Sequence, residues 1–81
     1  MNVIIIEKTD NWHSYNNREI LGVAESKAAA LLFIRRYLKV NNFDKLSEDD
    51  EYNLLNISQT QNYTENFEFN LMEIKLVTIN D

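Results

Sequence analysis

The side chains that most often perform acid–base or metal chemistry are scarce in this sequence. His13 is the single histidine, and the 81 residues include no cysteine. A general base needs a positioned partner and a substrate site. A zinc site built on one histidine would need three or more further ligands from carboxylates or water. We therefore expect His13 to be an exposed loop residue, and we expect no metal, no cofactor and no enzyme activity.

The densest group of carboxylates is the run Glu48, Asp49, Asp50 and Glu51. Calcium loops place their ligands at alternating positions and need a glycine for the turn, whereas these acids are consecutive and lack one. Two interpretations stay open: solvated acids in the first turn of a helix, where negative charge is favourable, or an acidic patch for a basic partner. Because Gly22 is the only glycine, a glycine-rich phosphate loop is excluded.

Cationic side chains surround one apolar residue in the middle of the chain. On a helix, Leu32 would have Arg35, Arg36 and Lys39 as neighbours on the face opposite the apolar stripe. This arrangement predicts a small contact site for a partner, since arginine is frequent among residues that dominate binding energy. The alternative is a singly exposed leucine, which is normal. Three cations beside an acidic half form a weak footprint for nucleic acid, so we do not expect direct nucleic-acid binding.

Large aromatic side chains occur in an otherwise polar loop near the N-terminus. Trp12 and Tyr15 share this loop, and such residues are common anchors at protein interfaces. The loop can equally fold back and cap the edge of the core. Tyr63 and Phe67 would extend the same patch if their segment lies nearby.

Charge is unevenly distributed along the chain. Residues 1–43 carry a formal charge of +2 and residues 44–81 carry −7, within a net charge of −5. Such asymmetry suggests steering toward a partner, unless the two halves face each other in the fold. Eight acids of the second half would resemble a nucleic acid if they shared one surface. They are Asp44, Glu48, Asp49, Asp50, Glu51, Glu65, Glu68 and Glu73.

Hydrophobic periodicity predicts the element order ββααβ. Strands are expected at 3–7, 18–25 and 67–79, a long helix at about 27–40 and a short helix at about 48–57. Ser26 and Ser47 occupy N-cap positions. Gly22 is expected at a bulge or a close approach of the helix, and a change of apolar phase predicts another bulge near 71–72.

These elements predict an α+β fold in a single domain, 1–81. A three-stranded, mainly antiparallel sheet would carry the long helix on one face. The other face would need the short helix or a second subunit. A ligand-sized pocket would have to come out of the modest core or form between subunits. The absence of cysteine and of a long apolar run favours a cytoplasmic protein without membrane contact.

The segment 20–30, ILGVAESKAAA, resembles the strand–serine–helix join of many small bacterial and phage domains. The whole chain, which is short, acidic and free of cysteine and proline, also resembles small phage-encoded inhibitors such as anti-CRISPR and other anti-defence proteins. The resemblance implies stoichiometric binding to a host protein, without assigning roles to residues. The alternatives are a structural or regulatory homo-oligomer, including a homodimer, and a weak nucleic-acid-binding module that uses the basic helix face.

Overall fold

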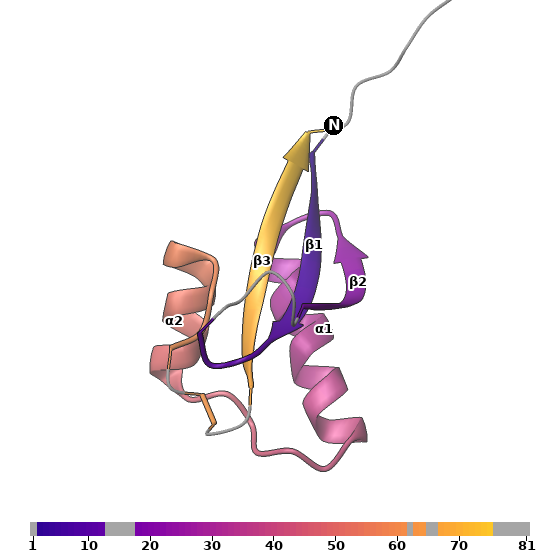
Figure 1. Ribbon diagram of the computed structural model, residues 1–81. Helices are drawn as coiled ribbons and strands as arrows, with labels where there is room; N and C mark the ends of the chain where they lie inside the picture. Colours follow the sequence, from indigo (N-terminus) through magenta and orange to yellow (C-terminus); the bar gives the residue numbers. More distant parts are fainter. Residues whose placement is uncertain (1, 13–17, 62, 65–66, 76–81) are drawn as a thin grey trace, which may run out of the picture.

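A three-stranded sheet and two helices make up the part of this protein that the structure describes (Figure 1). The computed structural model describes residues 2–12, 18–61, 63–64 and 67–75. Within these residues the elements are β1 (Asn2–Thr9), β2 (Glu19–Ala24), α1 (Lys27–Val40), α2 (Glu48–Ile57) and β3 (Glu68–Lys75). The predicted α+β class and the order ββααβ are confirmed.

The isoleucine-rich strand β1 lies at the centre of the sheet, whose strand order is β2-β1-β3. Both neighbours are antiparallel to it. The segment after α2 continues the sheet beyond β3, because Thr60 donates its N–H to the Phe69 carbonyl at 3.0 Å and Leu71 donates to Ser58 at 2.7 Å. Central placement agrees with the run of β-branched residues in β1, which favours burial on both faces.

The predicted bulge near 71–72 is wrong. Strands β1 and β3 pair without a register break, from Asn2 opposite Lys75 to Thr9 opposite Glu68. The change of apolar phase has another cause. The upper ends of β1 and β3 extend past the helices (Figure 1), so Glu73 on the helix-facing side is exposed. Since no helix covers that end of the ribbon, an apolar side chain is not required there.

A bulge does lie between β1 and β2, next to Gly22, where a bulge was one of the two alternatives expected. Ile6 pairs with Gly22 and Glu7 pairs with Ile20, so that Leu21 is an extra residue in β2. It breaks the regular alternation of a strand, in which Leu21 would share a face with Val23. Leu21 packs against the core, while Ile20 and Val23 are 64% and 60% exposed.

Gly22 permits the close approach of α1 to β2. A Cβ at this position would lie 2.9 Å from the Cζ atom of Phe33. Its φ angle is not positive, so the requirement for glycine comes from the neighbouring ring and not from the backbone. The prediction of a close approach at Gly22 is confirmed.

Helix α1 covers one face of the sheet. Its buried residues are Ala30, Leu31, Ile34 and Leu38. Phe33, which the periodicity places on the buried stripe, is 37% exposed because it leans over Gly22 at the sheet edge. Leu46 and, from α2, Leu54 complete the core, together with four strand residues. These are Ile4, Ile6, Phe69 and Leu71.

Helix α2 lies alongside α1 and not across the other face of the sheet. Its Glu51 bonds to Arg35 in the middle of α1, and its Leu55 carbonyl accepts from Lys27 Nζ at 3.5 Å near the start of α1. The helices are therefore antiparallel neighbours. Of the two alternatives for covering the outer face of the sheet, the short helix or a second subunit, the short helix is therefore wrong. Within the part of the chain that the structure describes, neither helix has the length and apolar character needed to cross a membrane.

Candidate functional site: a basic cleft beside an acidic hollow

The end of α1 is fixed by its terminal hydrogen bonds. Asn42 adopts a left-handed conformation, with φ of 59°. Phe43 donates its N–H to the Leu38 carbonyl at 2.9 Å, and Asn42 donates to Lys39 at 3.3 Å. This pair of bonds is a Schellman motif, which ends the helix and turns the chain. The helix ends where the predicted bounds of about 27–40 placed it, and the motif places the Phe43 ring beside the last turn of α1.

The start of α2 is fixed by a reciprocal capping box. Ser47 Oγ accepts from the Asp50 N–H at 3.1 Å, and the Asp50 carboxylate accepts from the Ser47 N–H at 2.9 Å. The predicted N-cap at Ser47 is confirmed. The connector, residues 43–46, begins with the last residue of the Schellman motif and ends just before this cap. It is therefore held at both ends.

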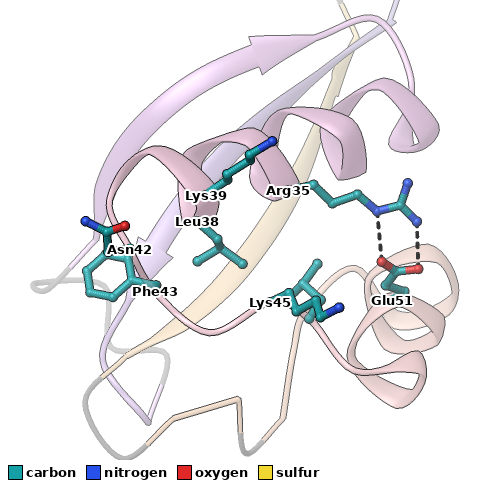
Figure 2. A pocket seen from close by; sticks show the side chains of 8 residues that line it. Arg35, Leu38, Lys39, Asn42, Phe43, Lys45 and Glu51 are labelled. Atoms are coloured by element: carbon teal, nitrogen blue, oxygen red, sulfur yellow. Dashed lines mark hydrogen bonds and ion pairs between the residues drawn. The ribbon is translucent and has the colours of Figure 1, made fainter.

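A cleft opens between the end of α1, this connector and the first turn of α2 (Figure 2). Its volume is about 570 Å³. Leu38, Phe43 and Leu46 provide its apolar lining, and Arg35, Lys39, Asn42, Lys45 and Glu51 provide its polar lining. Three cationic side chains thus face one carboxylate. We call this site the basic cleft. A ligand-sized space therefore exists at the surface of one chain, contrary to the expectation that it would need the core or a second subunit.

One end of the basic cleft is closed by an ion pair between the helices. The Arg35 guanidinium donates from Nε and one terminal nitrogen to the two Glu51 oxygens, at 2.9 and 2.8 Å. This geometry is bidentate and charge-assisted. Hydrogen bonds from Arg35 hold the pKa of the Glu51 carboxyl below its ordinary value, and they raise the pKa of Arg35. Arg35 therefore already binds a carboxylate within the chain.

An acidic hollow of about 700 Å³ adjoins the basic cleft, and Lys45 lines both. Asp44, Asp49, Tyr52 and Tyr63 contribute to its wall. The Tyr63 hydroxyl donates to the Asp44 carbonyl. Burial raises the pKa of Tyr63 to about 12, and the charges of Asp44 and Asp50 add to the shift. Two hollows of opposite charge thus meet at Lys45.

The connector packs against an aromatic cluster through its residue Phe43. The ring of Phe43 lies 5.2 Å from Phe67 and 6.3 Å from Tyr37, centroid to centroid. Phe67 and Tyr63 in turn both lie 5.5 Å from Phe69. Tyr63 and Phe67 are therefore part of the packing beneath the two hollows. Phe43 remains 42% exposed, so part of its ring is available to a ligand.

The four consecutive acids 48–51 differ in burial and in their hydrogen-bond partners. Asp50 is buried in the capping box and Glu51 is paired with Arg35. Glu48 and Asp49 are exposed, as is Asp44 just before the helix. Of the other acids in the predicted array, Glu68 is buried, Glu73 lies on the projecting sheet end, and Glu65 lies outside the described residues. A continuous array of eight acids is not present.

The cations predicted to share one face of α1 line two different hollows. Arg35 and Lys39 line the basic cleft, whereas Arg36 faces away from it. Leu32 is 61% exposed, and it shares a shallow hollow of about 450 Å³ with Ala29, Phe33 and Arg36. The helix therefore presents two separate contact surfaces.

The loop aromatics are described only in part. The Trp12 side chain is 83% exposed, and the backbone N–H of Trp12 donates to Asp10 Oδ1 at 3.1 Å. Tyr15 and His13 lie outside the described residues, so their predicted roles stay predictions. In residues 2–12, 18–61, 63–64 and 67–75, no three histidine, aspartate or glutamate side chains gather closely enough to hold a metal ion.

The connector residues Phe43, Lys45 and Leu46 were not predicted as part of a site. Their segment has neither strong periodicity nor a motif, and only the predicted N-cap Ser47 indicated where it ends. Comparisons with protein-family models, curated proteins and solved structures found no match to this chain.

Proposed function

We propose that this chain is a non-enzymatic protein-binding module that acts on a host protein by stoichiometric binding, as phage-encoded inhibitors do. The observation that carries the proposal is the meeting of the basic cleft and the acidic hollow at Lys45. A partner that matches both must carry charges of both signs. Proteins do so, whereas a nucleic-acid backbone carries one sign only.

The rigid construction of this surface supports the same proposal. The connector 43–46 is held by a Schellman motif on one side and a capping box on the other. A surface that is ordered before binding loses little conformational entropy when a partner docks. The exposed part of Phe43 offers an apolar contact between the charges, which is the usual composition of an interface centre.

Affinity capture from host lysate tests the proposal. The tagged chain is compared with a cleft variant, Lys39→Glu/Lys45→Glu, and a hollow variant, Asp44→Lys/Asp49→Lys. Lys75→Gln, at an exposed position on β3, is the control. We expect one abundant partner at a 1:1 ratio, lost with both charge reversals and kept with the control. The same proteins from all four samples, or no partner from any of them, would refute the proposal.

A further inference from the structure

Two lysines face the basic cleft with their charges available. Lys39 projects from α1 and Lys45 from the connector, on opposite walls (Figure 2). Among the described residues the ion pairs involve other cations, namely Lys8, Arg18 and Arg35. The side chains of Leu38, Phe43 and Leu46 provide the apolar lining of the same cleft. The complement of this arrangement is a carboxylate next to a bulky apolar group.

The surroundings of the cleft select against a long polyanion. Asp44, Glu48 and Asp49 are exposed beside it, along the connector and the first turn of α2. A phosphate backbone that filled the cleft would pass these carboxylates on leaving it, and like charges repel. A chain that carries a cation just beyond its carboxylate would gain from the same acids.

Resting on the proposed function, we infer that the basic cleft receives a short extended segment of the partner in which acidic and bulky apolar side chains are followed by basic ones. The acidic and apolar side chains enter the cleft beside Lys39 and Phe43. The basic side chains reach the acidic hollow on the other side of Lys45.

Glu51 occupies the position of a competing ligand. Its carboxylate is held by Arg35 at the end of the cleft, through the two hydrogen bonds that an incoming carboxylate would make. Replacing Glu51 with glutamine removes this charge and leaves Arg35 to the incoming segment. The inferred site therefore predicts that a substitution within the cleft strengthens binding, which a loss of structure would not do.

A peptide titration followed by NMR tests this inference. The probe is the acetylated hexapeptide Glu-Leu-Glu-Gly-Lys-Lys, added to the isotope-labelled chain at low salt. We expect amide shifts centred on Lys39, Phe43 and Lys45. Lys39→Gln and Lys45→Gln should each weaken binding about threefold, and Glu51→Gln should tighten it about threefold. Lys75→Gln should leave the affinity unchanged.

Matched probes separate the alternatives. Peptides with leucine changed to serine, with both glutamates changed to glutamine, or with both lysines changed to glutamine should each bind more weakly than the parent. Equal binding by any of them would overturn the inference. So would equal or tighter binding of a deca-thymidine oligonucleotide or of octanoate at the same residues. If the peptide fails while affinity capture still depends on Lys39 and Lys45, the inferred segment is wrong and the proposed function stands.

Discussion

Buried carboxylates in this chain are each held by hydrogen-bond donors. Glu7 accepts from Arg18 at 3.2 Å and from Asn70 at 3.0 Å. Glu68 accepts from the Thr60 hydroxyl at 3.0 Å and from the Tyr63 N–H at 2.7 Å. A buried charge is costly unless it is paired and hydrogen-bonded, so these residues contribute to the fold and not to a charged surface. The burial of Glu68 is one reason why counting acids along the sequence overstated the acidic array.

Removing the charge of Glu7 should destabilise the protein. The side chains of Glu7 and Arg18 are 6% and 15% exposed, so water replaces little of a lost interaction. We expect Glu7→Gln to lower the free energy of unfolding by about 1–3 kcal/mol, measured by urea denaturation. Glu19→Gln is the control, since its side chain is 66% exposed in its pair with Lys8. It should change stability by less than about 0.5 kcal/mol. Equal effects would show that burial does not matter at this pair.

Tyr63 provides a titration that reports on the acidic hollow. Burial, together with Asp44 and Asp50, raises its pKa to about 12, from an ordinary value of 10.0. The folded state therefore holds the phenol proton more tightly than the unfolded state, so stability should fall as pH rises from about 10 toward 12. We expect an absorbance titration to show a phenol with a midpoint near 12, absent from Tyr63→Phe. Asp44→Asn should lower that midpoint only partly, because burial is the larger cause. A midpoint near 10 in the unaltered chain would contradict this description of the hollow.

At the scale of elements, caps and periodicity predicted more than strand patterns did. Helix α1 and helix α2 begin after Ser26 and Ser47 as the sequence indicates, because N-capping is a local property. The faces of β2 do not follow simple alternation, since one extra residue at Leu21 reverses the alternation that follows it. A bulge depends on the pairing of two strands, and a single strand sequence does not determine it.

The contact between Gly22 and Phe33 couples β2 to α1. An alanine Cβ at position 22 would lie 2.9 Å from the ring, whereas the backbone there tolerates any residue. We expect Gly22→Ala to destabilise the protein by about 1 kcal/mol through this overlap. In a Phe33→Ala background the same change should be stabilising by about 0.5 kcal/mol, as a glycine replaced in a strand without strain.

A double-mutant cycle on Gly22 and Phe33, followed by thermal or urea unfolding, gives the coupling directly. The sign change is the decisive feature. If Gly22→Ala costs the same free energy in both backgrounds, the ring is not what requires glycine at this position. The bulge at Leu21 would then be the remaining explanation for the residue.

Across the whole molecule, the two oppositely charged halves meet only in part. Arg35 from the first half bonds to Glu51 from the second, which satisfies one cation within the chain. Lys39 and Lys45 instead line the basic cleft beside exposed acids. The sequence therefore predicted the charge asymmetry and several of the residues involved. It did not predict that charges of both signs would meet around a four-residue connector, because this depends on how α1 and α2 pack together.

An apolar row on the outer face of the sheet is a candidate surface for self-association. Val23 and Met72 flank Ile5 in one row across the three strands, and Val23 is 60% exposed. Association through such an apolar row should strengthen as salt screens the net charge of −5. Association of the basic cleft with acids of another copy should instead weaken as salt is added.

We expect a monomer at micromolar concentration in low salt, measured by sedimentation velocity. Arg35 is already paired with Glu51, and copies that each carry a charge of −5 repel each other. A dimer that forms in low salt and dissociates at about 0.5 M NaCl, where the screening length is only a few ångströms, would support the homo-oligomer alternative. A dimer that appears only at high salt and is abolished by Val23→Lys would place the contact on the sheet, and would leave the basic cleft free for its partner.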